Sequence, residues 1–392
     1  MITVSEALGH LFALADPVGT ETVPLIEAAG RVLAETAVSG RDQPPFAASA
    51  MDGYAVIEQD ATPGARLVVI GESAAGHRFD GPVSPGQAVR IFTGAPVPDG
   101  ATRVIIQEDV TRNGDTILLG DTLDTGTHIR PAGGDFRVGA GLHAPRLLSP
   151  EDIALLASMN VPQVTVARKP RVALISTGDE LVMPGETPGP DQIIASNTFG
   201  LHALLRRLGA EPRLLPIARD KRSSLDLVLD LAEGADLIVT IGGASVGDHD
   251  LVASVAADRG MDRAFYKVAM RPGKPLMAGR LGRAMMVGLP GNPVSALVCG
   301  HVFLAPVIRA MTGLGKTPAP RQTARLTKQL DVNGPREHYM RAICTAEGIG
   351  PFDRQDSSLL SLLSQANALM VRPPHDPPRA PGDTIEYIAL DG

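Results

Sequence analysis

The chain has 392 residues and a net charge of −7, and aromatic residues make up only 3% of it. A chain of this length exceeds what one hydrophobic core supports, so we expect two or more domains. The acidic balance and the scarcity of rings disfavour nucleic acid and anionic membranes as main partners, because both favour basic surfaces and single strands also stack on aromatic side chains.

The N-terminus predicts an amphipathic helix and not a targeting segment. The stretch MITVSEALGHLFALA lacks the basic start and continuous apolar core of a signal peptide, and Thr3 and Glu6 have the spacing of a capping box. No apolar run approaches the roughly 20 residues of a membrane span. Cys299 and Cys344 belong to no disulfide or zinc pattern. We therefore predict a cytoplasmic protein with buried free thiols.

The first 170 residues predict a few helices and many short strands. Residues 1–35 indicate one or two helices, and residues 36–60 indicate irregular chain. Apolar runs between 65 and 120 predict strands separated by turns, and Asn113-Gly114 marks a hairpin. The remaining elements expected here are a helix over 151–159 and a connector over 164–170.

Strands and helices alternate between residues 170 and 312, which predicts a mostly parallel sheet with helices on both faces. Asn197 is the expected N-cap of the first helix. The expected strands are 171–177, 213–218, 235–243, 264–270, 275–281 and 283–289, and the expected helices are 198–209, 223–234, 250–260 and 291–311. Short apolar runs after 318 predict a small all-β domain.

One loop of this predicted sheet has the composition of a phosphate and metal site. The strand ending IVTIGG continues as ASVGDHD, which brings Gly242, Gly243, Ser245, Asp248 and Asp250 together. Glycine lets backbone N–H groups approach a phosphate, and two carboxylates beside a phosphate make sense when a divalent cation lies between them. Helix capping by either aspartate is the alternative that this loop alone leaves open.

Three further loops are expected at the same edge, because ligands of parallel sheets bind beyond the carboxyl ends of the strands. STGDEL follows the first strand, LPGNPVSA follows the last one, and ARD ends another. Glycines, hydroxyls, carboxylates and a helix N-terminus would meet there. The residues are Ser176, Thr177, Gly178, Glu180, Asp220, Pro290, Gly291, Asn292, Pro293 and Ser295.

Positive charge comes from YKVAMRPGKP, in which Lys267, Arg271 and Lys274 surround a Pro-Gly turn. These side chains would balance the charge of a phosphate. A solvated basic turn is the alternative for each of them.

Six motifs together resemble one family. SAMDGYA, IFTGAPVPDGAT, ISTGDEL, GGASVGDHD, MRPGKP and GLPGNPVSA occur in the order found in the molybdopterin molybdenumtransferases, the MoeA group that includes the E domain of gephyrin. The resemblance runs from about residue 3 to the C-terminus. It implies a multidomain α/β fold with a central doubly wound domain similar to molybdopterin adenylyltransferase, β-rich N-terminal domains and a small C-terminal β-barrel-like domain.

The resemblance also implies where the domains begin and end. A helical and linker domain would span 1–40 and 136–168, and a β-rich domain would span 41–135 between these two parts. The central α/β molybdopterin-binding domain would span 169–316, and the C-terminal β domain would span 317–392.

The activity implied is the insertion of molybdate into adenylylated molybdopterin, with Mg²⁺ and release of AMP. The family works as a homodimer with a shared active site, and molybdopterin adenylyltransferase and cofactor-carrier proteins are the further partners expected. Two alternatives remain open from the sequence. One is a non-catalytic, dimeric molybdopterin-binding scaffold, and the other is a paralogue specialised for tungstate.

Family roles transfer to matching positions of this chain. The resemblance implies catalytic roles for Asp52, Thr93, Glu180, Asp220, Asp250, Lys267 and Arg271, with metal bound by Glu180, Asp220 and Asp250. It implies substrate contacts for Arg130, Asp135, Gly247, a serine of the C-terminal domain that is Ser357 or Ser358, and the loop residues named above, including Lys274. HIRPAGGD lacks one arginine of the family pattern, and position 271 carries arginine where relatives can have lysine, which changes donor geometry.

Overall fold

The predicted alternation of strands and helices after residue 170 forms the central sheet of the protein. The computed structural model describes residues 1–243 and 251–390. The sheet has the strand order β18-β15-β19-β23-β22-β20. The first four strands run parallel, and β22 and β20 extend the sheet in antiparallel fashion, so the prediction of a mostly parallel sheet is confirmed. The strands are β15 (Arg171–Ser176), β18 (Glu211–Leu214), β19 (Leu237–Ile241), β20 (Asp262–Tyr266), β22 (Met277–Leu281) and β23 (Ala284–Leu289).

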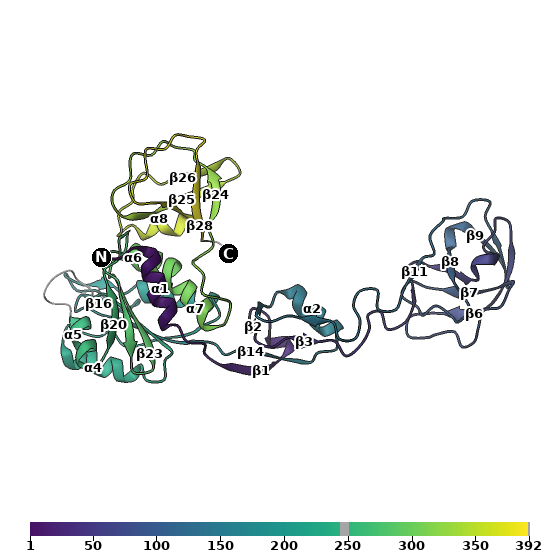
Figure 1. Ribbon diagram of the computed structural model, residues 1–392, viewed down its shortest axis with the longest axis horizontal. Coiled ribbons are helices and arrows are strands. Elements are labelled where there is room, and N and C mark those ends of the chain that lie inside the picture. The colour runs from purple at the N-terminus through teal and green to yellow at the C-terminus, as the bar shows by residue number, and fades with distance from the viewer. Residues whose placement is uncertain (244–250, 391–392) are drawn as a thin grey trace.

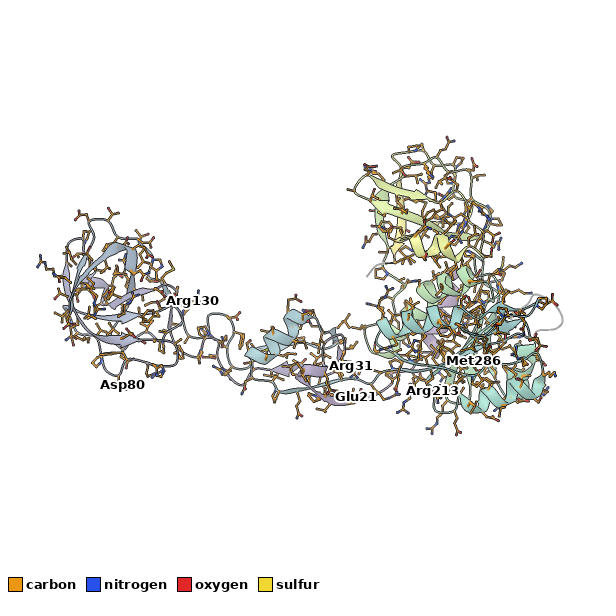
Figure 2. The ribbon with its side chains drawn as sticks, turned by 180° about the vertical axis from the view of Figure 1, so that it is seen from behind. Glu21, Arg31, Asp80, Arg130, Arg213 and Met286 are labelled. Carbon is orange, nitrogen blue, oxygen red and sulfur yellow. The ribbon has the colours of Figure 1, made fainter. Side chains whose placement is uncertain are left out.

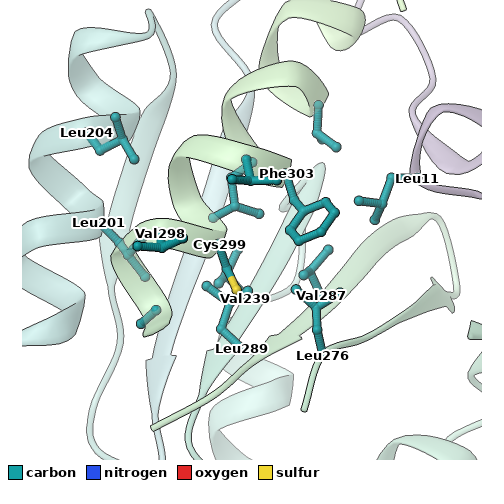
Figure 3. Close-up of a cluster of buried hydrophobic side chains, with 14 of the residues drawn as sticks. Leu11, Leu201, Leu204, Val239, Leu276, Val287, Leu289, Val298, Cys299 and Phe303 are labelled. Atoms are coloured by element: carbon teal, nitrogen blue, oxygen red, sulfur yellow. The ribbon is translucent and has the colours of Figure 1, made fainter. Parts of the chain in front are cut away.

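Helices cover both faces of this sheet, because its strands are apolar on both sides. Helices α4 (Arg222–Leu231) and α5 (Leu251–Asp258) share one core with the sheet. The other core holds α3 (Asn197–Arg207) and a long helix made of α6 (Pro293–Cys299), a π-helical stretch (Gly300–Leu304) and α7 (Ala305–Met311). Figure 3 shows its centre, where Phe303 and Cys299 lie over Val239, Val287 and Leu289.

The N-terminal helix α1 (Val4–Leu14) packs into this same core through Leu11 and its neighbours (Figures 1 and 3). Its predicted capping box is present: the Thr3 hydroxyl accepts the Glu6 N–H, and the Glu6 carboxylate accepts the Thr3 N–H. We call α1, the central sheet and its helices the central body.

The chain leaves the central body after α1 and forms a smaller sheet, which we call the middle sheet. Its strand order is β1-β14-β2-β13. The predicted helix after Ser149 is α2 (Pro150–Ser158), capped by Ser149 and Asp152. Residues 1–35 contain α1 as their one α-helix. The expected connector over 164–170 was wrong in part, since residues up to Ala167 pair with β1. The strands are β1 (Thr20–Pro24), β2 (Val32–Leu33), β13 (Arg146–Leu147) and β14 (Gln163–Ala167), with β3 (Ala37–Val38) pairing β12 (Gly141–Leu142) and a 3-10 turn at Leu25–Glu27.

Beyond the middle sheet lies a β-rich unit, the distal lobe. Its main sheet has the order β8-β5-β7-β6-β10-β9, and β11 (Ile129–Arg130) pairs β4 (Ala48–Ser49) beside it. The predicted hairpin is confirmed, because Asn113 pairs with Thr116 across a turn in which Gly114 has φ +62°. The main-sheet strands are β5 (Gly53–Val56), β6 (Arg66–Ser73), β7 (Gln87–Ile91), β8 (Arg103–Ile106), β9 (Val110–Asn113) and β10 (Thr116–Leu119), and 3-10 turns lie at Glu58–Asp60 and Gln107–Asp109.

The C-terminal residues form a small β domain as expected, but the domain is not all-β, because it contains a helix at Leu360–Gln365. Its strands follow the order β21-β25-β27-β28-β24, with β26 pairing β25. A bridge joins Leu326, directly after β24, to Ile349 of β26, and β26 in turn pairs with β25, so the sheet closes like a barrel. The elements are β21 (Met270–Arg271), β24 (Gln322–Arg325), β25 (Glu337–Thr345), β26 (Gly348–Pro351), β27 (Ala368–Arg372), β28 (Thr384–Ala389) and α8 (Leu360–Gln365).

Three further local predictions require correction. Residues 36–60 are not irregular throughout, because β3, β4 and β5 lie within them. Strand β18 ends at Leu214, so the predicted strand over 213–218 is mostly loop. The statement that no apolar run is long enough for a membrane was also wrong, because helix Pro293–Met311 has 19 apolar-rich residues; 78% of its apolar window is buried inside the protein, where it fills the central core.

Figure 1 shows the resulting shape. The central body and the C-terminal barrel lie together at one end, the middle sheet forms an arm, and the distal lobe lies at the opposite end. The chain runs out along the arm and back again, which places residues 48–130 far from the central sheet.

Candidate functional site

A large cavity opens at the carboxyl ends of the parallel strands, where the sequence predicts a ligand. Its volume is about 1130 Å³. All four predicted loop segments contribute to its wall, together with one residue of the C-terminal barrel. The predicted residues that line it are Ser176, Thr177, Gly178, Glu180, Asp220, Gly242, Gly243, Pro290, Gly291, Asn292, Pro293 and Ser358.

The glycines of two loops have positive φ and leave little room for a side chain. Gly242 has φ +93°, and a Cβ there would lie 2.7 Å from the Thr177 carbonyl oxygen. Gly178 has φ +144°, and a Cβ there would meet the carboxylate of Glu180. Positive φ and this close approach both require glycine. The two loops therefore pack together and leave their backbones facing the cavity.

The acidic loops are joined by hydrogen bonds between backbone and carboxylate. The Asp220 N–H donates to Asp179 at 3.1 Å, and the Asp179 N–H donates to Asp220 at 3.4 Å. Arg219 also lines the cavity, and its guanidinium donates to the carbonyls of residues 178, 179 and 181 at 2.9–3.4 Å. The cation thus holds the acidic loop in shape, which places Glu180 and Asp220 on the same cavity.

The start of helix α6 forms the third side of the cavity. Asn292 is the N-cap as predicted, but its amide donates to the Ser357 hydroxyl at 3.0 Å instead of capping the helix. Asn197 was expected to be a cap as well; it is the first residue of α3, and its amide donates to the Gly291 carbonyl at 2.7 Å. Ser295 does not line the cavity, because it is buried inside α6.

The C-terminal barrel completes this side. The Val294 N–H donates to the Ser357 carbonyl at 3.1 Å, which docks the barrel loop on α6. Ser358 faces the cavity, and its hydroxyl and N–H both donate to Asp356, which lowers the pKa of that carboxyl. Ser245, Gly247, Asp248 and Asp250 lie outside the described residues.

The predicted cations lie beside the cavity and not among the described residues of its wall. Arg271 and Lys274 are exposed, and Lys274 precedes Pro275, which does line the cavity. The Lys267 ammonium lies 4.9 Å from the centre of the Tyr266 ring. The pairing of β21 with β25 turns this segment toward the C-terminal barrel, a long-range contact that the local sequence does not indicate.

Asp52 and Thr93 form a second predicted cluster on the distal lobe. The Thr93 N–H and hydroxyl each donate to Asp52 Oδ1 at 2.7 Å. These two bonds, the backbone bond above all, lower the pKa of Asp52, and the nearby Arg90 guanidinium acts in the same direction. Arg90 is held over the rings of Tyr54 and Phe92. Asp52 is therefore an ionised, preoriented carboxylate.

Arg130 and Asp135 also lie at the distal end of the arm. Arg130 is exposed at the end of β11, on the side of the distal lobe that faces the arm (Figure 2). The Asp135 N–H donates to the Gln43 carbonyl at 2.9 Å, where the two chain passages between lobe and arm lie side by side. Within one chain, these four residues and the cavity occupy opposite ends of the molecule.

The carboxylates of the cavity fit a magnesium ion that keeps phosphate or water ligands. Glu180 and Asp220 both line the wall, and Mg²⁺ in proteins is commonly bound by one or two carboxylates plus substrate phosphates. Across residues 1–243 and 251–390, no group of three or more His, Cys, Asp or Glu is placed to hold a metal without such ligands. Asp250, the third predicted ligand, is outside this part.

Among the cavity residues that escaped the sequence predictions are one arginine and two isoleucines. Arg219 directly precedes the predicted Asp220, so the ARD motif itself was the available signal. Ile193 and Ile194 line the cavity although their side chains are exposed to 59% and 38%. They come from a segment without hydrophobic periodicity, the strand β17 (Ile193–Ile194) beside β16 (Leu181–Val182), and no sequence pattern marks it.

Three family models match consecutive parts of the chain. They are described as "MoeA N-terminal region (domain I and II)" for residues 2–160, "Probable molybdopterin binding domain" for 173–310 and "MoeA C-terminal region (domain IV)" for 323–390.

Curated relatives and solved structures extend this likeness over the whole chain. A molybdopterin molybdenumtransferase of Nostoc sp. is 38% identical over 90% of this chain and 85% of its own. Molybdopterin molybdenumtransferase 2 of Mycobacterium tuberculosis is 38% identical over 94% and 92%. Two structures of the molybdopterin biosynthesis MoeA protein of Pyrococcus horikoshii, 30% and 27% identical, superpose with TM-scores of 0.84 and 0.85 over 100% of both chains.

Proposed function

The chain belongs to the MoeA family of molybdopterin molybdenumtransferases, and we propose that it joins molybdate to adenylylated molybdopterin in the cavity described above, with Mg²⁺ and release of AMP. Membership makes the protein an enzyme of molybdenum cofactor biosynthesis, with molybdopterin and molybdate as substrates. The names of the relatives favour neither the scaffold nor the tungstate alternative.

The cavity wall supports the binding of a phosphorylated pterin. The backbones of Gly178, Gly242 and Gly243 face the cavity at the ends of buried strands, where N–H groups can approach phosphate oxygens. Beside the acidic loop, where the Ile193 N–H donates to the Glu180 carbonyl, Ile193 and Ile194 offer apolar surface to a planar ring. A cavity of about 1130 Å³ suits a substrate that contains both a pterin and a nucleotide.

Glu180 and Asp220 would hold the magnesium ion, joined by Asp250. An ion held there would supply charge neutralisation and Lewis acidity at the anhydride. Arg219 keeps the acidic loop in place through its three carbonyl contacts. The interlocked hydrogen bonds of Asp179 and Asp220 fix the loop without consuming the Glu180 carboxylate.

The cations beside the cavity would act on charge that develops as AMP departs. Lys274 adjoins the rim residue Pro275, and Arg271 and Lys267 lie on the same segment. Positive charge placed at a leaving phosphate stabilises the transition state. We assign no covalent nucleophile to the protein, so its contribution is positioning and electrostatic stabilisation.

A second copy of the chain would complete the active site. The main observation in support is the distance between the two predicted clusters of site residues. Glu180 and Asp220 line the cavity, whereas Asp52 and Thr93 lie on the distal lobe at the other end of the elongated chain. In a homodimer of antiparallel chains, each distal lobe would bring its preoriented Asp52 to the cavity of the partner. Arg130 would add a cation there for an oxyanion.

We propose that the domains span 1–40 with 136–168, 41–135, 169–316 and 317–392. The three large sheets that precede the C-terminal barrel support this division, since none of them crosses a proposed boundary; the barrel itself takes one strand, β21, from residues 270–271. We also propose a cytoplasmic location, which suits two free cysteines. Molybdopterin adenylyltransferase and cofactor-carrier proteins are the further partners we propose.

The proposal is tested by AMP release from adenylylated molybdopterin in the presence of molybdate and Mg²⁺. We expect turnover by the wild-type protein and a loss of about 100-fold or more in Glu180→Gln and Asp220→Asn, because both remove charge that faces the anhydride. Tight molybdopterin binding without AMP release would instead favour the scaffold. Competition between molybdate and tungstate measures which oxyanion the enzyme prefers.

A further inference from the structure

Within the described chain, two short stretches of backbone connect the arm to the central body. Residues 15–19 lead from α1 to the middle sheet, and residues 168–170 lead back from β14 to the central sheet (Figure 1). Any rotation of the arm relative to the central body passes through these stretches. Because the distal lobe lies at the far end of the arm, a small change of angle here becomes a large displacement of Asp52.

Arg168 ties both stretches to the central body. Its Nε donates to the Val18 carbonyl at 3.0 Å, and its Nη1 donates to the Lys169 carbonyl at 3.0 Å. Its two Nη atoms also bind Asp236 bidentately, at 2.8 and 3.0 Å. Asp236 precedes β19 and also accepts the Arg171 N–H at 2.7 Å. One guanidinium therefore joins the outgoing strand, the returning strand and the central sheet.

Arg280 makes a second connection of the same kind. Its Nη2 donates to the Leu14 carbonyl at 2.8 Å, and its Nη1 pairs with Asp16 at 3.0 Å. The Val18 N–H donates to the carbonyl of Met311, at the end of the central helix, at 3.1 Å. Arg280 comes from β22, so the outgoing stretch is fastened to two different elements of the central body.

These contacts have the properties of a strong, oriented joint. The Arg168–Asp236 pair is partly buried, with side chains exposed to 30% and 23%. Bidentate pairs between arginine and carboxylate fix direction as well as distance. The pair lies on the opposite edge of the sheet from the cavity, because Asp236 precedes β19 and the cavity follows it. It therefore contacts no substrate.

We propose that Arg168 and Asp236 are positioning residues for the reaction: they set the angle of the arm so that the distal lobe of one chain reaches the cavity of the other. This inference rests on the shared active site proposed above. The pair would affect the reaction rate in the partner's cavity but not the rate in the cavity of its own chain.

Mixed dimers separate this role from simple stabilisation. A dimer purified through two tags, with Asp52→Ala in one chain and Glu180→Gln in the other, retains one intact composite site. Its lobe comes from the Glu180→Gln chain and its cavity from the Asp52→Ala chain. Activity of this parent dimer tests the shared site; an inactive parent would overturn that proposal and the inference with it.

Arg168→Met is then added to one chain at a time. In the Glu180→Gln chain, which donates the lobe, we expect kcat to fall on the order of tenfold to 100-fold, as small misplacements of reacting groups do, with little change in KM for molybdopterin. In the Asp52→Ala chain, we expect parent activity. Equal losses in both placements, or no loss in either, would overturn the positioning role while leaving the shared site intact.

Arg259→Met is the matched control. Arg259 is exposed to 31% and pairs with Asp226 and Asp230, but both partners belong to the neighbouring helix of the same body. We expect no effect of this variant in either chain.

A structural measurement checks the joint without activity. Spin labels at Glu35 on the arm and Arg213 on the central body, diluted with unlabelled protein, report the angle as a distance distribution. Arg168→Met should broaden this distribution and Arg259→Met should not. An unchanged distribution in Arg168→Met would contradict the inference.

Discussion

The contact between Gly178 and Glu180 gives a sharp test of the acidic loop. Gly178→Ala introduces a Cβ that would lie 2.6 Å from the Glu180 carboxyl carbon and 2.7 Å from Oε1. Ordinary contact begins at 3.4 Å, and Oε2 would lie even closer to the new Cβ than the carboxyl carbon does, so the carboxylate has to retreat by about 1 Å. The far end of a flexible side chain can make this move, which predicts a folded protein with a displaced carboxylate.

The backbone contributes a second, separable effect. Gly178 has φ +144°, and an alanine forced into such a conformation destabilises the fold by about 1–3 kcal/mol. Gly185 supplies the matched control on the same segment: it has φ +95°, and a Cβ there meets nothing within 4 Å. Gly185→Ala therefore carries a comparable backbone strain and leaves the carboxylate where it is.

We expect Gly178→Ala to lower kcat/KM for AMP release by about 100-fold, since a shift near 1 Å at a reacting group has effects of that size, and to require more Mg²⁺ for half-maximal activity. Gly185→Ala should keep activity within about twofold. Urea unfolding of both variants measures the backbone strain. Wild-type activity in a folded Gly178→Ala protein, or an equal activity loss in Gly185→Ala, would refute the reasoning.

Three other outcomes follow from the described contacts. Ile193→Ser should raise the Kd of either AMP or a pterin about tenfold, since it removes apolar contact with one ring. Leu227→Ser is the control, because Leu227 is exposed to 62% and lies outside the cavity, and it should change neither Kd. Binding titrations with each ligand identify the ring, and an Ile193→Ser protein with both Kd values unchanged would contradict the apolar wall. Thr93→Val keeps the backbone bond to Asp52 but removes the hydroxyl, so the pKa of Asp52 should rise toward its ordinary value. The acid limb of the pH–activity profile, where activity is lost as Asp52 becomes protonated, should then move to higher pH. An acid limb that does not move counts against a role for ionised Asp52. Burial raises the pKa of the Cys299 thiol, so iodoacetamide should alkylate it only after unfolding, as mass spectrometry can show, and rapid alkylation of the folded protein would contradict this burial.

Local signals in the sequence predicted most elements of the fold. The capping box at Thr3 and the Asn113-Gly114 turn are set by neighbours in the chain, and both are present. Alternating apolar strands and helices predicted the parallel sheet, and the sheet in turn predicted that four loops would share one edge. A failure came from a long-range contact: Asn197 has the side chain of a cap, but its amide donates to the Gly291 carbonyl, far away in the sequence.

The sequence by itself determined which chemistry is available, because glycine, carboxylate and hydroxyl groups follow buried strands and must meet at one edge. Only the tertiary structure decided which groups can act together. The arm carries Asp52 away from Glu180, and Arg219, Ile193 and Ile194 reach the cavity from loops without a pattern. The physical reason is that periodicity and turn chemistry act over a few residues, whereas the direction of the arm depends on long-range contacts such as Arg168 with Asp236.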